Sequence, residues 1–207
     1  VMHGVALTGF SAGKRSLGFF GLEGNQLQVR ADRQALRQVL RHSHTFPLGK
    51  TPVSMWYKHR YDNPYLRDEL LDYGLLVDTL ETVTTWHSLL PLYHGVREKI
   101  QATLADLQIP GLVMAHISHV YETGSSLYFI ILAQPKLGTE LAAWHQIKNA
   151  ASAAILQYGG VISHHHGIGL DHATWLKKQL DPVSQAALVG LKNSLDPVGV
   201  LNPGKLI

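Results

Sequence analysis

The stretch GLVMAHISHVYETGSSLYFIILA, residues 111–133, decides the fold that we expect. Its two outer parts, residues 111–121 and 126–133, are rich in β-branched and aromatic residues, which favour the pleated surface of a strand. The residues between them, Glu122 to Ser125, include Gly124, and a short connection of this kind is typical of a β-hairpin. Because a hairpin joins strands that run in opposite directions, at least part of the sheet is predicted to be antiparallel.

Amphipathic helices are predicted on both sides of this hairpin. From Trp86 to Pro110, apolar residues recur at every third or fourth position. After the hairpin, Thr139 begins a second helix of the same period, which Gly159 ends. VDTLET, residues 77–82, is predicted to be a further strand. The sequence therefore predicts an α+β fold, with helices on one face of an antiparallel sheet.

The N-terminal part of the chain gives weaker patterns. We expect one helix after Asp32, and another that Asn63-Pro64 begins and Gly74 ends. Residues 47–61 are predicted to be irregular. Two apolar stretches that glycines interrupt are predicted to be strands: residues 1–10 and 16–22.

The last forty or so residues differ from the rest. They hold a histidine-rich loop, a short helix that begins near Asp181, and the turn-rich tail LDPVGVLNPGKLI at residues 195–207. We therefore divide the chain into a larger domain at residues 1–160 and a C-terminal segment at residues 161–207, which we expect to belong with a neighbouring structure.

The composition excludes several classes of function. Charged residues make up only 16% of the chain, which suggests that something covers part of its surface. The basic residues from Arg30 to Arg41 are spaced like the solvated face of a helix, so nucleic acid is not a predicted partner. The chain has no cysteine, which excludes disulfides and thiolate chemistry, and it has no apolar run of the about 18 residues that span a bilayer. A cytoplasmic location is the default expectation.

The motif SHHHGIG, residues 163–169, is the main candidate for chemistry. Imidazoles titrate near neutral pH, and neighbouring imidazoles oppose one another's protonation, so a cluster can hold neutral and charged members together. Gly167 and Gly169 allow the backbone to approach a flat ligand closely. A histidine-rich surface loop without a function is the alternative that these residues leave open.

A metal site is not predicted. His116 and His119 are three residues apart in a predicted strand, so we expect them to point to opposite faces. His164, His165 and His166 are adjacent, and adjacent side chains rarely converge on one ion. No acidic residue stands at ligand spacing beside them.

Spacing alone does not single out two further residues. Arg67 lies one turn into a predicted helix, where an arginine usually makes a local ion pair, for example with Asp68 or Glu69. Tyr128 lies in the middle of a predicted strand, where a tyrosine is usually half-buried packing.

Four stretches carry a resemblance to a known family: PYLRDELLDYGLLVDTLETVTTW (64–86), SLYFII (126–131), SHHHGIG (163–169) and LDPVGVLNPGK (195–205). In this order they resemble the FAD-linked oxidases of the vanillyl-alcohol-oxidase type, and most closely the alkyldihydroxyacetonephosphate synthase branch. The resemblance covers roughly residues 60–207. It implies that residues 1–160 form the cap, or substrate, domain and that the segment after them returns to an FAD domain.

The resemblance also implies a cofactor and partners. FAD would be bound mainly by an N-terminal domain that this chain lacks, either in the same protein or in a separate chain. The chain opens at Val1 without an initiator methionine, which suggests a part of something longer. The substrate would be a small or lipid-like molecule, and a homodimer is left open.

Individual residues take roles from the same resemblance. Arg67 would bind the acyl or carboxylate end of the substrate, Tyr128 would be the acid–base residue, and His165 and His166 would assist proton transfer. His164 and Asn202 would contact the cofactor. The implied reaction replaces the acyl group of acylated dihydroxyacetone phosphate with an alkyl group through a flavin adduct, without net oxidation.

Departures from the branch leave the substrate open. The chain has LETVTTW where the synthases carry a proline before the tryptophan, and Asp171-His172-Ala173 where they carry a basic stretch. One alternative is an FAD-dependent 2-hydroxy-acid dehydrogenase of the D-lactate or glycolate type. His165 counts against it, because those enzymes resemble this chain but carry a glutamate there. The other alternative is a non-catalytic binding domain that lacks its FAD half.

Overall fold

A computed structural model describes residues 16–43 and 45–206 of the chain. The chain divides into two compact units, Val1–Pro64 and Tyr65–Ile207. The predicted strand at residues 1–10 lies outside the described residues. The predicted division between residues 160 and 161 stays a prediction.

The first unit holds two helices, α2 (Gln26–Arg41) and α3 (Thr51–His59). The helix expected after Asp32 exists but begins earlier, because the Asn25 side chain accepts hydrogen bonds from the first backbone N–H groups and so caps it. The irregular structure expected at residues 47–61 is wrong, since α3 lies there with a proline in its first turn. Residues 16–22 form no strand: the Phe19 and Phe20 side chains are exposed, and no strand among the described residues pairs with this stretch.

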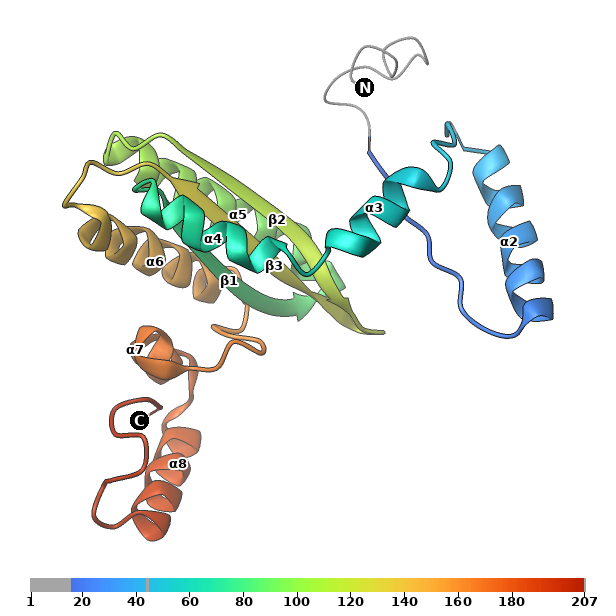
Figure 1. The fold of residues 1–207 in the computed structure, drawn as a ribbon. Coiled ribbons are helices and arrows are strands. Elements are labelled where there is room, and N and C mark those ends of the chain that lie inside the picture. The colour runs from blue at the N-terminus through green and yellow to red at the C-terminus, as the bar shows by residue number, and fades with distance from the viewer. Residues whose placement is uncertain (1–15, 44, 207) are drawn as a thin grey trace. The chain divides into compact units, whose positions relative to one another are not determined.

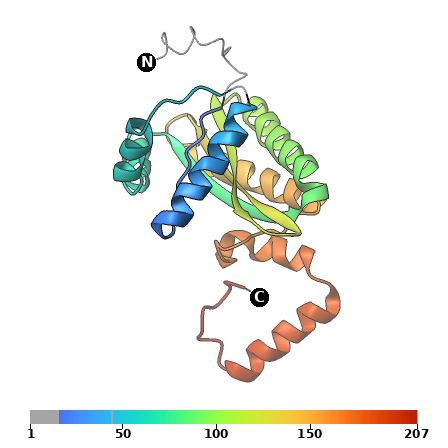
Figure 2. The same cartoon turned by 90° about the vertical axis from the view of Figure 1, so that its right-hand side faces the viewer.

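The second unit contains the predicted hairpin and sheet. Strands β2 (Gly111–Val120) and β3 (Gly124–Ala133) pair as the hairpin, and β1 (Leu76–Thr85) pairs with the other edge of β3. All pairs are antiparallel, in the order β1-β3-β2. Helices α5 (Trp86–Asp106) and α6 (Glu140–Gln157) pack side by side over one face of this sheet (Figures 1 and 2). The predicted α+β fold is confirmed.

The core lies between these two helices and the sheet. Alternate residues of β3, Leu127, Phe129 and Ile131, are buried against them. The helices supply buried residues at helical spacing: Leu92, Val96 and Ile100 from α5, and Ile147, Ala151 and Ile155 from α6. Strand alternation then directs the intervening residues of β3 to the other side of the sheet.

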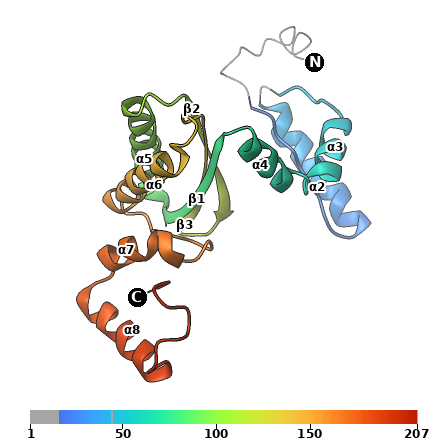
Figure 3. The same ribbon diagram turned by 60° about the vertical axis from the view of Figure 1, so that its left-hand side comes forward.

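That side, which we call the outer face, is the side of the sheet away from α5 and α6 (Figure 3). The strand register arranges its residues in three cross-strand rows: Val77–Leu132–Leu112, Thr79–Ile130–Met114 and Glu81–Tyr128–His116. Two rows are mostly apolar, and the third is polar. The outer face therefore changes in character along the strands.

The remaining helices of the second unit come before and after the sheet and its two helices along the chain. Helix α4 (Asn63–Asp72) precedes β1, and Gly74 follows it with φ of 74°, as predicted. Helix α8 (Pro182–Leu195) begins at the predicted cap Asp181, whose carboxylate accepts from the N–H groups of residues 183 and 184. Helix α7 (Gly169–Gln179) was not predicted, because no side chain caps its start at Ile168. None of the described helices is both long and apolar enough to cross a bilayer.

Candidate active site

A cluster of ionisable side chains lies at the polar end of the outer face. Tyr128 is the cross-strand neighbour of both Glu81 on β1 and His116 on β2. The His116 ring stacks on the Tyr128 ring, with the centroids 5.1 Å apart. The sheet register alone therefore brings a carboxylate, a phenol and an imidazole together.

The histidine loop is fixed to the free edge of β1. The backbone N–H of Val161 donates to the carbonyl of Val83 (3.1 Å), and that of His164 donates to the carbonyl of Glu81 (3.2 Å). The Thr82 hydroxyl also donates to the carbonyl of Val161 (2.7 Å). These bonds follow the strand edge and place the three histidines at Glu81.

The loop then turns back on itself. The Ser163 hydroxyl donates to the carbonyl of Gly167 (2.8 Å), and Gly167 has φ of 75°, a conformation that favours glycine. His172 on α7 also contacts this carbonyl through Nδ1 (3.2 Å). The glycine expected to permit an unusual backbone therefore closes the loop that carries the histidines.

The three histidines surround the Glu81 carboxylate. His165 Nδ1 lies 2.7 Å from Oε2, His166 Nε2 lies 3.6 Å from Oε2, and His164 Nδ1 lies 3.7 Å from Oε1. The His166 ring meets the Tyr128 ring edge-on, with the centroids 5.4 Å apart. Three residues predicted to act together, Tyr128, His165 and His166, thus lie in one cluster; their roles stay predictions.

The prediction that His116 and His119 point to opposite faces is wrong. The pairing of β2 with β3 shifts register between Ile117 and Val120, and the irregularity breaks the alternation of side chains. The His119 ring consequently lies 5.2 Å from the ring of His164 and 5.1 Å from that of His165. Both strand histidines belong to the cluster.

The cluster also contains a group with the composition of a metal site. Glu81, His119, His164 and His165 each offer a ligand atom, and these atoms lie within 4.8 Å of one another. The acidic residue that the sequence did not show near the triplet comes from β1. His164 Nδ1 also lies 3.1 Å from His165 Nδ1, within hydrogen-bond distance, so a hydrogen bond can join these two nitrogens. We therefore treat the group as a hydrogen-bonded acid–base cluster.

Two other predicted site residues lie apart from these contacts. Arg67, on α4, is exposed, and no hydrogen bond or ion pair joins it to another described residue. Asn202 is exposed in the tail, where it has φ of 44° and its carbonyl accepts from the N–H of Lys205 (3.3 Å). His164 does belong to the cluster, and its Nε2 lies 3.0 Å from the hydroxyl of Tyr121. The ligands expected for all three stay predictions.

Sequence reasoning missed Glu81 as a site residue. The signal was a carboxylate in the middle of the predicted strand VDTLET, where a charged residue needs a partner. Its partners could not be predicted, because Ser118 and the histidine loop are distant in sequence. The Ser118 hydroxyl donates to Glu81 Oε1 and lies 2.6 Å from the hydroxyl of Ser126.

The cluster perturbs the protonation of two of its members. Burial alone raises the pKa of Glu81, but the hydrogen bonds from Ser118 and Ser126 and the charges of His165 and His164 outweigh it and bring the pKa below 4.5. Burial lowers the pKa of His166 below 6.5; Glu81 opposes this, whereas His165, Lys148 and His172 add to it. At neutral pH the cluster therefore holds an ionised carboxylate and a neutral His166.

Both shifts predict that acid destabilises the fold. Because the pKa values of His166 and Glu81 are lower when folded, the unfolded chain binds more protons as the pH falls. Their stabilisation is complete above the unfolded values of 6.5 and 4.5 and is lost as the pH falls through the folded ones. Hydrogen bonds from Ser184 and Lys192 also lower the pKa values of Asp181 and Asp196, which adds to the second loss.

We therefore expect the melting temperature to fall on acidification in two stages, one below pH 6.5 and one below pH 4.5. Thermal melting between about pH 8 and about pH 2 (about one reading per half unit) measures this. His166→Asn should weaken the first stage, whereas His145→Asn, on the exposed side of α6, should not. A melting temperature that rises from neutral pH toward pH 5 (roughly) would show that the sign is wrong.

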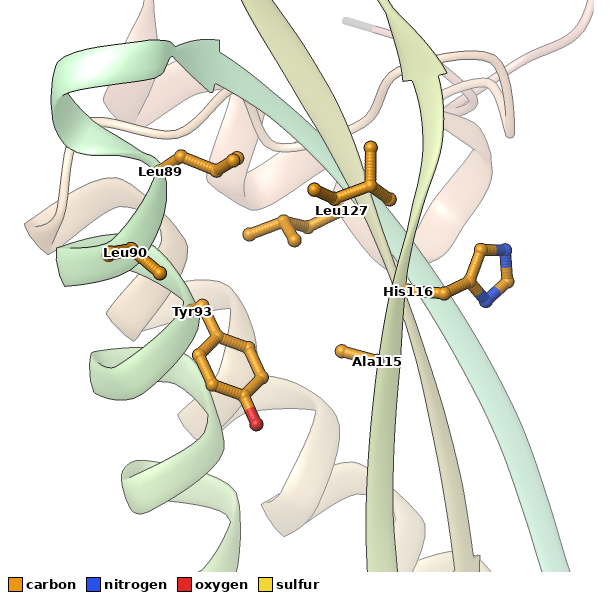
Figure 4. A pocket seen from close by; sticks show the side chains of 7 residues that line it. Leu89, Leu90, Tyr93, Ala115, His116 and Leu127 are labelled. Atoms are coloured by element: carbon orange, nitrogen blue, oxygen red, sulfur yellow. The ribbon is translucent and has the colours of Figure 1, made fainter. Parts of the chain in front are cut away.

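A separate apolar pocket of about 200 Å³ lies between α5 and β2. Leu89 and Tyr93 of α5 and Ala115 of β2 line it (Figure 4). Figure 4 shows the His116 ring on the other side of β2, pointing away from this space. The pocket is thus a gap in the helix–sheet layer, and His116, whose ring belongs to the cluster on the outer face, also borders it.

The fold and the site together define a class of protein. It is an α+β domain with helices on one face of an antiparallel sheet and a cluster of ionisable side chains on the other. The family model described as "FAD linked oxidases, C-terminal domain" matches residues 3–206 of the chain. The chain belongs to this family. FAD is accordingly the cofactor of the enzymes to which it is related.

Within this family, the chain is similar to two proteins that share one name. The alkyldihydroxyacetonephosphate synthase of Dictyostelium discoideum is 34% identical over 191 residues, which cover 92% of this chain and 31% of that protein. The protein of the same name from Trypanosoma brucei brucei is 31% identical over 199 residues, which cover 96% of this chain and 32% of that protein. The resemblance seen in the sequence motifs is confirmed.

A solved structure supports the same relation. An alkyldihydroxyacetonephosphate synthase structure matches with a TM-score of 0.60 and 28% identity, over 88% of this chain and 30% of that one. The cap fold expected from the resemblance agrees with this match. The chain spans about a third of the length of the curated relatives that it matches.

Proposed function

We propose that this chain is the substrate-binding part of an FAD-dependent enzyme that exchanges the acyl group of acylated dihydroxyacetone phosphate for an alkyl group. The observation that carries the proposal is the cluster on the outer face, where Tyr128, His165 and His166 meet around a buried carboxylate. The similarity to two alkyldihydroxyacetonephosphate synthases supports this choice of reaction.

The proposed partner is an FAD-binding domain that faces the cluster. The His165 side chain is 54% exposed and sits directly above Glu81, so a second surface can reach it. Exposed apolar residues of the outer face, Leu112 and Met114, favour a covered rather than a solvated surface. The relatives' greater length is consistent with an additional domain.

The imidazoles around Glu81 offer hydrogen-bond donors that a flavin at the edge of the cluster could use. The Glu81 Oε2 atom is buried and makes no hydrogen bond with a described residue, and three imidazoles surround it. Within the proposal, His164 and Asn202 would contact the flavin. When bound, the flavin would supply the reactive centre at which an alkyl group replaces the acyl group.

The chain's own residues would move the protons. A free tyrosine hydroxyl titrates near pH 10 (about), so Tyr128 needs nearby donors or positive charge to act as a base at neutral pH. His116 stacks on its ring and His166 meets its edge, so two imidazoles adjoin the phenol, and proton transfer would need one of them to come within hydrogen-bond reach of its hydroxyl. His166, neutral at this pH, is the member of the triplet that suits proton acceptance.

Arg67 is the proposed contact for the acyl end of the substrate. Its guanidinium is exposed and free to offer a planar fork of donors to a carboxylate or ester oxygen. The exchange itself balances without an oxidant: a fatty alcohol enters, a fatty acid leaves, and the alcohol proton is passed to the cluster. No net electron transfer takes place.

Product analysis tests the proposal. The full-length flavoprotein that contains this chain would be incubated with acylated dihydroxyacetone phosphate and a labelled long-chain alcohol. We expect the label in an ether product and release of one fatty acid per ether formed. Reduction of the flavin by D-lactate or glycolate without ether formation would instead support the 2-hydroxy-acid dehydrogenase alternative. If neither reaction occurs, the result would support the remaining alternative, a non-catalytic binding domain.

A further inference from the structure

Glu81 is a carboxylate buried at a place where its neighbours are partly exposed. Its residue exposure is 2%, whereas the His165 side chain beside it is 54% exposed. An ionised group without water is costly unless it has close partners. The partners of Glu81 therefore show what this residue does.

Neutral donors satisfy one of its two oxygens. The Ser118 hydroxyl donates to Oε1, and Ser118 in turn contacts the Ser126 hydroxyl. The Ser126 hydroxyl also accepts from the backbone N–H of His119 (2.9 Å). This chain of polar contacts exists because β2 is irregular at residues 117–120, and it fixes the orientation of the carboxylate.

The other oxygen is left for the histidine loop. Oε2 makes no hydrogen bond with a described residue, yet His165 Nδ1 is 2.7 Å away. The distance is within hydrogen-bond range, although this conformation forms no hydrogen bond there, and the same nitrogen also lies 3.1 Å from His164 Nδ1. Because a carboxylate only accepts, His165 would be the donor through Nδ1.

Several titratable side chains from different elements face the Glu81 carboxylate. His164, His165 and His166 face it from the loop, and His119 faces it from β2. Tyr128 and His116 adjoin it in the same cross-strand row, and Tyr121 contacts His164. Lys148 of α6 and His172 of α7 act on His166 from other elements, but Asp78 binds Lys148 (3.0 Å). Glu81 is thus the carboxylate that contacts the histidines among the described residues.

We infer that Glu81 is a positioning residue for the proposed reaction: its buried carboxylate holds the His165 ring in place and supplies the negative charge that the three imidazoles share. Glu81 does not itself contact the substrate in this account. The inference rests on the proposed function for its catalytic consequence, but its effect on the histidines does not depend on flavin or substrate.

The substitution Glu81→Gln removes the charge of the side chain but keeps its size, so it tests the effect of the charge alone. Glutamine has the size of glutamate and can still accept the hydrogen bond from Ser118, but it carries no charge. The control Glu98→Gln removes the same charge from an exposed position on α5, away from the outer face. Imidazole signals of the 207-residue chain would be followed by NMR against pH, with the triplet assigned from single His→Asn variants.

We expect the titration midpoint of His166 to move to lower pH in Glu81→Gln, because Glu81 favours protonation of His166. It should be unchanged in Glu98→Gln. Glu81→Asp retains the charge at a shorter reach and should restore part of the wild-type midpoint. If Glu81→Gln does not fold, a smaller shift in the same direction in Glu81→Asp gives the same answer.

In the full-length flavoprotein, loss of the positioning carboxylate should slow the exchange by roughly 10–100-fold, the loss typical when a partner that orients a metal-bound histidine is removed. An unchanged His166 titration in Glu81→Gln, with only a lower melting temperature, would overturn the inference and make Glu81 a structural residue. A shifted titration in a protein that forms no ether product would overturn the proposed function and leave the role of Glu81 in the cluster intact.

Discussion

Replacement of Tyr128 by phenylalanine is expected to lower the turnover of the full-length flavoprotein by roughly 10²–10⁴-fold, the range typical of a lost acid–base group. The ring stays in place, since its packing against His116 and His166 involves the ring rather than the hydroxyl. The Tyr128 hydroxyl makes no hydrogen bond with a described residue, so the fold should lose little. Turnover and flavin content of the purified variant measure the effect.

The melting temperature of Tyr128→Phe provides the control. A tyrosine that merely packs on the sheet would lose at most about 0.5–1.5 kcal/mol with its hydroxyl and keep its activity per folded molecule. Full turnover in a variant that retains its flavin would therefore remove Tyr128 from the reaction. The family relationship would then support the fold alone.

The neighbouring residue should behave in the opposite way. Phe129 follows Tyr128 on β3 but faces the helices, is 0% exposed, and stacks on Tyr93 with the ring centroids 6.4 Å apart. Phe129→Ala leaves a cavity in the middle of the core and is expected to reduce the free energy of unfolding by about 3–5 kcal/mol. Chemical denaturation of the chain measures this loss.

The two substitutions together test the assignment of faces. If Phe129→Ala costs less than about 1 kcal/mol, the helix–sheet layer does not form the core described above. If it destabilises the chain as expected while Tyr128→Phe leaves stability unchanged, the two sides of β3 have separate roles. One side then holds the fold together, and the other presents the reactive groups.

The sequence predicts the second unit well, because its elements depend on local patterns. The hairpin at residues 111–133 combines two strand-like runs with a glycine-bearing turn, and the helix from Trp86 keeps its apolar period over its whole length. Asp181 likewise marks the start of α8 with a cap that the structure contains. In each case the residues that form the element also lie next to one another in sequence.

The failures have a common cause in contacts that are not local. Residues 16–22 have the composition of a strand, but a strand needs a neighbouring strand, and none of the described residues provides one. The shared face of His116 and His119 depends on a register irregularity that only the pairing with β3 creates. Helix α7 begins without a capping side chain, so no sequence signal marked it.

In the candidate site, too, local sequence patterns were predictable and contacts between distant residues were not. The triplet at residues 164–166 was recognisable as acid–base groups from its composition, and the role of Tyr128 came from the resemblance alone. Glu81 escaped notice because its partners come from β2, β3 and a loop some eighty residues further along the chain. Only the folded sheet reveals that these residues share one carboxylate.

The central claim is that the histidines on the outer face exchange protons during the flavin-dependent step. The most direct test is the rate of flavin bleaching in a single turnover of the full-length protein, measured against pH in wild type, His166→Asn and His145→Asn. We expect an inflection on the acid side of pH 6.5 in wild type and in His145→Asn, and no such inflection in His166→Asn. Identical pH profiles in all three proteins would contradict it.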